Sequence, residues 1–303
     1  MNSELDLSES HPKSTPSCPL CAGREQGLRF SDKGYKVLVC RKCGLLFIHP
    51  YPPDGSQVHL RVASNNGAQI RVLDAEQQYR LEVQYYKKYF PLIAQECEKA
   101  KAILDVGCGT GYLLERLSIY PSLYRAGIEL NSARAEFAKK ISKCEIYQVP
   151  IEEFASPTKF DVIAMINVIS HIPSFDGLFH SLRSLLAENG RLILKVGEMA
   201  SDAQKGDLTD WGIPDHVHFL GLNTLSYICQ KYRFQVVKHD RIPLSADIFT
   251  QDRWRAPSRT PWKNVVKQVV SRAPMALPIL ATWYDLTHGK RAFSSFIVLS
   301  VQS

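Results

Sequence analysis

Between Lys101 and Val196, short apolar runs alternate with segments of helical periodicity, and this alternation constrains the fold more than any other feature of the chain. The runs AILDVG, YRAGIEL, EIYQV, FDVIAMI and GRLILKV predict strands, and apolar residues recur at helical spacing in several of the segments between them. Strands that alternate with helices of this length predict βαβ units and a parallel sheet covered on both faces. Farther on, the sequence predicts a helix from Asn223 to Tyr232 and two more strands, FQVVKHD and FSSFIVLSV.

A glycine-rich turn, LDVGCGTGY, joins the first of these strands to the next helix. Gly107, Gly109 and Gly111 allow positive φ angles and a close approach of the backbone to a ligand. Such a turn at the carboxyl edge of a parallel sheet is where α/β proteins bind nucleotides. The second strand ends at Glu129, 18 residues after Gly111, where a carboxylate can accept hydrogen bonds from both hydroxyls of a ribose.

The spacing of the glycines separates two classes of nucleotide cofactor. The dinucleotide fingerprint GxGxxG needs glycine or alanine at position 112, where this chain has Tyr112. The chain has GxGxG instead, with Asp105 two residues before the first glycine. An acid there suits a cofactor with an ammonium group, such as the aminobutyrate end of S-adenosylmethionine, rather than a pyrophosphate.

Several segments together resemble the class I S-adenosylmethionine-dependent methyltransferases: LDVGCGTGYLLERL with GIELN, then FDVIAMINVISHI and LLAENGRLILKVG. The resemblance covers about residues 101–200, the stretch DHVHFLGLNTLSYI and the final strand. It implies an α/β fold with a Rossmann-like sheet of seven mostly parallel strands, helices on both faces, and transfer of a methyl group from S-adenosylmethionine.

The resemblance also implies roles for individual residues. Asp105 would lie near the amino group of the cofactor, Glu129 would hold the ribose hydroxyls, and Leu130 would pack on the adenine. Pro150 stands where the family often has an acid, so the adenine contacts fall to the two residues after it. The predicted cofactor-binding residues are Asp105, Gly107, Gly109, Gly111, Glu129, Leu130, Ile151, Glu152 and Asn167.

Two CxxC pairs, Cys18 with Cys21 and Cys40 with Cys43, are separated by 18 residues. This spacing is typical of a tetrahedral zinc site with four thiolate ligands, and the segment between the pairs reads as the hairpin of a zinc ribbon. Four thiolates leave no open position for water, so the zinc would be structural. A ribbon before a class I domain is similar to a bacterial methyltransferase group that acts on sugars and natural products.

The sequence thus predicts four regions. Residues 1–17 are a polar, disordered tail, 18–50 the zinc ribbon, 51–100 a linker with N-terminal helices, and 101–303 the methyltransferase domain. Apolar and aromatic residues recur at helical spacing from Asp74 to Lys99, with a kink expected at Pro91. The tyrosines of this helix either cover the cofactor, as in similar enzymes, or belong to the core.

Two segments offer a general base for a hydroxyl acceptor: His171 follows the fourth strand, and His216 lies in IPDHVHFL after the fifth. The predicted catalytic residues are His216 first and His171 second; the alternative is that both only anchor loops. The predicted reaction is methylation of a small molecule or glycan, with oxygen as the favoured accepting atom. Because methyl transfer chiefly needs an in-line arrangement, the base is not an essential part of this prediction.

The net charge of +7 is concentrated between Gln251 and Arg272, where six basic residues accompany one acid. This stretch, with Trp262 and four valines at helical spacing, is interpreted as a packed helix, a weak contact with a membrane surface, or a patch for an acidic acceptor. An RNA methyltransferase that grips phosphates is one alternative function, and a non-catalytic partner that binds the cofactor is another. The N-terminal segment lacks the features of a signal peptide, so a cytoplasmic location is expected; the oligomeric state stays open.

Overall fold

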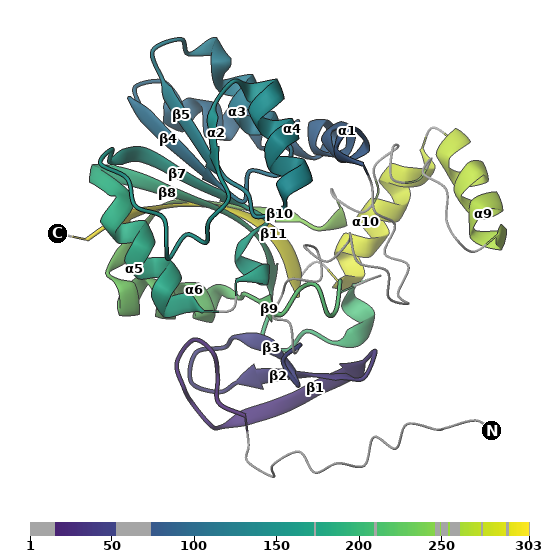
Figure 1. Ribbon diagram of the computed structural model, residues 1–303. Helices are drawn as coiled ribbons and strands as arrows, with labels where there is room; N and C mark the ends of the chain where they lie inside the picture. The colour runs from purple at the N-terminus through teal and green to yellow at the C-terminus, as the bar shows by residue number, and fades with distance from the viewer. Residues whose placement is uncertain are drawn as a thin grey trace, which may run out of the picture.

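The computed structural model describes residues 16–52, 74–172, 174–208, 211–245, 249, 254, 261–273, 275–288 and 291–302. Within them the chain forms a seven-stranded sheet covered by helices and a four-stranded sheet below it (Figure 1). Residues 1–15 of the expected tail and residues 53–73 of the expected linker region lie outside the described residues.

The seven-stranded sheet has the order β10-β11-β8-β7-β4-β5-β6. Its strands are β4 (Ala102–Val106), β5 (Tyr124–Ile128), β6 (Glu145–Tyr147), β7 (Phe160–Ile166), β8 (Leu186–Met199), β10 (Phe234–Pro243) and β11 (Ala292–Val301). The pairs from β6 through β8 are parallel, and β11 is antiparallel to both of its neighbours. The predicted sheet of seven mostly parallel strands is therefore confirmed.

Helices cover both faces of this sheet (Figure 1). On one face, α5 (Phe175–Leu185) and α6 (Leu222–Tyr232) pack their buried apolar residues against the strands. On the other, α1 (Ala75–Tyr86), α2 (Phe90–Cys97) and α3 (Tyr112–Arg116) form a second core. A further helix, α4 (Ser132–Ser142), is capped by the residue before it: the side chain of Asn131 accepts from the backbone N–H of Arg134.

Two local expectations need correction. A single helix with a kink at Pro91 was expected before the sheet, but α1 ends at Tyr86 and α2 begins at Phe90, so the break precedes the proline. Pro91 lies in the first turn of α2, where a missing N–H costs no helical hydrogen bond. Likewise the strand predicted as GRLILKV begins earlier than expected: β8 starts at Leu186, directly after α5, and shifts register against β7 in this region.

The four-stranded sheet has the order β1-β2-β3-β9 and is antiparallel throughout. Its strands β1 (Gln26–Asp32) and β2 (Tyr35–Cys40) form the predicted hairpin, which turns at Lys33 and Gly34. The third strand is β3 (Leu46–His49). The fourth, β9 (His218–Phe219), comes from the segment after β8, so the ribbon and the α/β unit share one sheet and one apolar cluster.

Between β10 and β11 the chain carries α9 (Pro261–Arg272) and α10 (Ala276–His288), which stand beside the main body (Figure 1). Leu277 and Tyr284 anchor α10, and the Tyr284 hydroxyl donates to the carbonyl of Asp207. None of the helices that the structure describes combines the length and apolar character needed to cross a lipid bilayer.

Candidate active site

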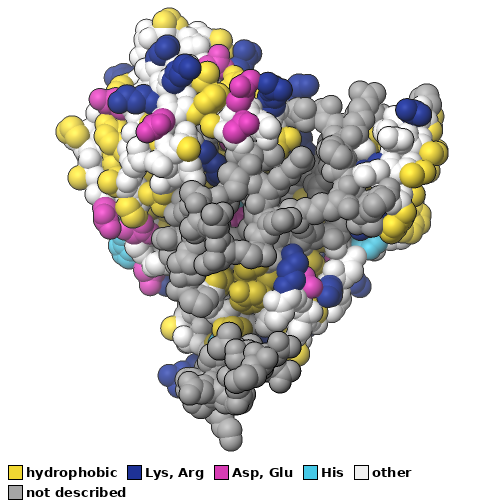
Figure 2. Space-filling model, turned by 45° about the vertical axis from the view of Figure 1, so that its right-hand side comes forward, with side chains coloured by type: hydrophobic (Ala, Val, Ile, Leu, Met, Phe, Trp, Pro, Cys, Tyr) yellow, Lys and Arg dark blue, Asp and Glu magenta, His cyan; other side chains and the backbone are white. Residues whose placement is uncertain are grey.

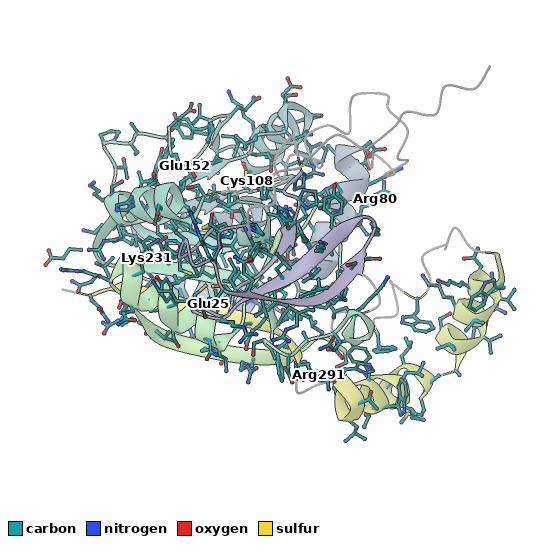
Figure 3. The ribbon with its side chains drawn as sticks, turned by 90° about the horizontal axis from the view of Figure 1, so that it is seen from below. Glu25, Arg80, Cys108, Glu152, Lys231 and Arg291 are labelled. Carbon is teal, nitrogen blue, oxygen red and sulfur yellow. The ribbon has the colours of Figure 1, made fainter. Side chains whose placement is uncertain are left out.

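A cavity of about 720 Å³ lies at the carboxyl edge of the seven-stranded sheet. Val106, Ile128 and Ile166, the last residues of three neighbouring parallel strands, all line it. This is the edge at which open α/β sheets bind ligands, because the loops after successive strands meet there. Cys108 and Glu152, labelled in Figure 3, also line the cavity.

The glycine turn forms one wall of this cavity. The backbone N–H groups of Gly107 and Cys108 donate to the carbonyl of Ile128, which ties the turn to the neighbouring strand. Gly109 has a φ angle of +56°, and a Cβ there would lie 2.5 Å from Oε1 of Glu82. The positive φ angle favours glycine at this position, and a Cβ would also displace the end of the Glu82 side chain.

Glu129 is held at the end of the second strand by two backbone hydrogen bonds. Its Oε2 accepts from the N–H of Gly109 at 3.0 Å, and its Oε1 accepts from the N–H of Asn131 at 2.8 Å. The side chain lines the cavity and is 6% exposed. These bonds fix the orientation of a carboxylate that can accept further donors, as the hydroxyls of a ribose require.

Asp105 is fully buried beneath the glycine turn, and neither of its carboxylate oxygens has a hydrogen-bond partner in the part of the chain that the structure describes. Burial, together with the nearby carboxylates Glu82 and Glu129, raises the pKa of Asp105 well above its usual value. A buried carboxyl in such surroundings ionises readily only when a cation lies beside it. This is the observation that fits a cationic ligand.

Glu82 extends from α1 over the same turn. Its carboxylate accepts from the backbone N–H of Thr110 at 3.2 Å and from the Thr110 hydroxyl. Burial nevertheless raises the pKa of Glu82. With Glu82, Asp105 and Glu129 close to one another, a cation at the site would favour the ionised carboxylates, whereas an anion such as a pyrophosphate would disfavour them.

Four more of the predicted cofactor-binding residues line the same cavity, whereas Asp105 and Gly111 are not among the described residues that line it. Leu130 lines it and is 40% exposed, Ile151 is buried in its wall, and Glu152 is exposed at its lining. Asn167, after β7, also lines it and has a φ angle of +63°, which is uncommon for a residue with a side chain. The structure thus gathers these residues with the glycine turn.

His171 lines the cavity from the short helix η4 (Ile169–His171) that follows β7. Its Nδ1 lies 2.9 Å from the backbone carbonyl oxygen of Asp215 and 3.6 Å from Oδ1 of the same residue. Because a carbonyl oxygen only accepts, Nδ1 carries a proton, and in the neutral imidazole Nε2 then carries the lone pair. Asp215, which the sequence analysis did not single out, also lines the cavity.

The two other histidines of this region have different surroundings. The ring of His216 packs edge-on against that of His171 at 4.8 Å, but His216 is not among the described residues that line the cavity. His218 is 1% exposed and packs 4.9 Å from the ring of Phe175. Burial lowers the pKa of His218 to about 3, so this side chain is a neutral core residue.

The α1 helix contributes more to the cavity than its aromatic residues suggested. Tyr85 and Tyr86 line it, whereas Tyr89 is fully buried in the core and its hydroxyl lies 2.7 Å from Oγ of Ser294. The sequence analysis missed Glu82 on this helix. The signal that could have identified it is its spacing: Glu82 lies three residues after Tyr79 and four before Tyr86, on the same helix face.

The four cysteines of the ribbon come together at the base of β1 and β2. The Sγ atoms of Cys18 and Cys43 are 3.5 Å apart, those of Cys21 and Cys40 are 3.4 Å apart, and all four lie within 4.8 Å of one another. A tetrahedral zinc with Zn–S bonds of about 2.3 Å places its ligands about 3.8 Å apart. The four thiols therefore match the donor type, number and spacing of a structural zinc site.

The fold and the cavity are those of a class I S-adenosylmethionine-dependent methyltransferase. The chain belongs to the methyltransferase domain family, whose match covers residues 76–239. Ubiquinone biosynthesis O-methyltransferase of Histophilus somni (strain 2336) is 33% identical over 107 residues, and the mitochondrial enzyme of the same name from Schizosaccharomyces pombe is 30% identical over 110. These matches cover 32% and 34% of this chain and 44% and 40% of the relatives, so the chain spans less than half of their length.

Solved structures share the fold at low sequence identity. The O-methyltransferase from the trans-AT PKS multienzyme of Brevibacillus brevis, in complex with S-adenosyl-L-homocysteine, has a TM-score of 0.51 and 19% identity, covering 79% of this chain and 81% of that one. The [4+2]-cyclase SpnF also has a TM-score of 0.51, with 14% identity over 72% and 82% of the two chains. Because the fold is shared with a cyclase, the reaction has to be argued from the site.

Proposed function

We propose that this protein binds S-adenosylmethionine in the cavity at the carboxyl edge of its sheet and transfers the methyl group to a hydroxyl of a small molecule or glycan. The buried carboxyl of Asp105, which has no hydrogen-bond partner among the described residues, carries this proposal, since it lies beneath the glycine turn with two other acids nearby. The O-methyltransferase names of the relatives support oxygen as the accepting atom.

Within this proposal the cofactor is held by carboxylates and by apolar surface of the cavity. Asp105 would accept from its ammonium group, and Glu129, fixed by Gly109 and Asn131, would accept from the ribose hydroxyls. Leu130 and Ile151 supply apolar surface for the adenine. When bound, the cofactor supplies a sulfonium methyl group, an electrophile that needs no further activation by the protein.

The acceptor hydroxyl would meet His171. The hydrogen bond from its Nδ1 to Asp215 sets the tautomer in which Nε2 accepts a proton. Asp215 and the ring of His216 fix the orientation of the imidazole, so the geometry favours His171 as the base and His216 as its support. Tyr85, Tyr86 and Ile166 line the cavity and would help to exclude water once cofactor and acceptor are bound.

Zinc belongs to the same proposal as a structural ion. Cys18, Cys21, Cys40 and Cys43 would hold it, and a site of four thiolates has no open position for substrate. The ion would supply the stability that a ribbon of about 30 residues lacks on its own.

Calorimetric titration of the zinc-loaded protein with S-adenosylhomocysteine, beside NADH, tests the cofactor. We expect binding of the former, loss of that binding in Glu129→Ala, and none of NADH. A screen of hydroxyl acceptors with a labelled methyl donor then tests the reaction. Binding of NADH alone would refute the assignment of the cofactor, and binding without turnover on any acceptor would favour a non-catalytic role.

A further inference from the structure

The two helices between β10 and β11 expose an unusual amount of apolar surface. Of the 17 large apolar side chains that are exposed among the described residues, eight lie between residues 262 and 286. They are Trp262, Val265, Val266, Val269, Met275, Ile279, Trp283 and Leu286, with exposed fractions from 45% to 81%. Scattered apolar residues are ordinary on a protein surface, but a gathered set marks an interaction site.

On α10 the exposed apolar residues form a stripe opposite the residues that anchor the helix. Leu277 and Tyr284, seven residues apart, are buried against the body of the protein. Ile279, Trp283 and Leu286 follow at spacings of four and three, so they share the opposite side of the helix. One side of α10 thus packs against the body of the protein, and the opposite side is exposed.

On α9 the apolar face is bordered by cations. Trp262, Val265, Val266 and Val269 recur at the helical spacing of one face. Lys263 lies to one side with its Nζ 5.7 Å from the Trp262 ring, and Arg272 lies on the other. In Figure 2, apolar side chains lie along the outer edge of the projecting part that α9 and α10 form, with a basic group at its tip. Figure 3 shows α9 standing apart from both sheets.

The charge of this surface indicates its partner. Among the described residues of α9 and α10 the cations are Lys263, Lys267 and Arg272, and the acid is Asp285. The Asp285 carboxylate accepts from the Ser245 hydroxyl at 2.8 Å, next to the body of the protein. A second copy docked through the same face would bring the cations of both copies into one interface, because a two-fold interface uses the same patch twice. An anionic surface would meet both the cations and the apolar face.

We propose that α9 and α10 form a docking surface for an anionic lipid membrane. The apolar faces would enter the boundary between headgroups and acyl chains, with tryptophans at that level and the basic side chains among the headgroups. Such binding is peripheral and reversible, and it draws on both apolar burial and charge. The inference rests on the exposed helix faces and is independent of the proposed methyl transfer.

Co-sedimentation with vesicles tests this surface, using phosphatidylcholine with and without phosphatidylglycerol. We expect the full-length protein to bind the anionic vesicles and to be released by added salt. The double variants Trp262→Ser with Trp283→Ser and Lys263→Glu with Arg272→Glu should each weaken binding about tenfold or more. Leu28→Ser and Lys140→Glu, matched changes at exposed positions elsewhere, should leave it within about twofold.

Tryptophan emission gives a second readout that does not depend on sedimentation. Trp262 and Trp283 are 64% and 58% exposed, whereas Trp211 is buried, so vesicle binding should shift the emission to the blue. Failure to bind either vesicle, or binding equal in the double variants and the wild type, would overturn the proposal. A dimer in solution that Trp262→Ser with Trp283→Ser dissociates would instead identify the face as an interface between copies. Unchanged melting temperatures would show that the variants are folded.

Discussion

Replacing Asp105 with asparagine tests the electrostatic argument for the cofactor most directly. The change keeps the size of the side chain and removes the charge of a carboxyl that is fully buried without a hydrogen-bond partner among the described residues. A hydrogen bond to a charged group contributes about 1.5–3 kcal/mol. We therefore expect Asp105→Asn to weaken the binding of S-adenosylhomocysteine, which keeps the ammonium group, by about 10- to 150-fold.

The pH dependence of binding gives the same test a sharper form. The pKa of Asp105 is raised in the free protein, so below that pKa the group is protonated and must lose its proton before it can pair with an ammonium. The affinity of the wild type should therefore rise with pH, by up to about tenfold per unit, between the pKa of Asp105 in the complex and its raised pKa in the free protein, and level off above the latter. Asp105→Asn should show a flatter profile, with the remaining slope due to Glu82, whose pKa is also raised.

Isothermal titration calorimetry across the neutral range, with the zinc site loaded, measures both effects. Asp161→Asn is the matched control, because Asp161 accepts from the N–H groups of Lys101 and Ala102 at the opposite edge of the sheet. Its affinity and pH profile should follow the wild type. An affinity of Asp105→Asn within about threefold of the wild type, with an unchanged profile, would refute the reasoning.

Three further outcomes are expected. His171→Asn should lower kcat by about 10²–10⁴-fold and remove the acidic limb of the pH–rate profile. The Kd of S-adenosylhomocysteine should stay unchanged. An unaltered pH–rate profile would exclude His171 as the general base. Gly109→Ala, which places a Cβ at positive φ and displaces the Glu82 carboxylate, should weaken cofactor binding in calorimetry by about fivefold or more, whereas Gly206→Ala, where the space is open, should leave it unchanged. Cys43→Ser should lower the amount of bound zinc and the melting temperature, and it should reduce kcat by about 10²-fold. The control variant Cys229→Ser should stay close to the wild type in all three. Equal zinc contents in the two variants would contradict the four-thiolate site.

Most of the fold could be predicted from sequence because its patterns are local. Buried parallel strands appear as continuous apolar runs, and the glycine turn and the hairpin between the cysteine pairs carry their own backbone signatures. The break between α1 and α2 was misplaced because Pro91 was taken as the cause of a kink, whereas a proline is tolerated in a first turn. The pairing of β3 with β9 left no local trace, since β9 has two residues and joins a strand far away in the chain.

The candidate site was predictable where it follows the strand ends, and less so where a helix folds over it. Glu129 and Asn167 stand after the strands that place them at the cavity. Glu82 reaches the glycine turn only through the packing of α1, which the sequence places before the sheet without fixing its position. Asp215 likewise meets His171 by a return of the chain over the cavity. The assignment of the catalytic residues stays a prediction.

The backbone of Val217 links the ribbon to the candidate active site. The carbonyl of Val217 accepts from the N–H of Ile48 on β3, and the N–H of Val217 donates to the carbonyl of Ser170, next to His171. Lys33 on the ribbon donates to the carbonyl of Ile213, and Lys231, labelled in Figure 3, donates from α6 to the carbonyl of Leu20. A structural change in the ribbon would therefore displace the segment that positions His171 more than it displaces the glycine turn. The glycine turn is held by hydrogen bonds to β5, on the far side of β4. This is why loss of zinc is expected to act on kcat more than on the affinity for the cofactor.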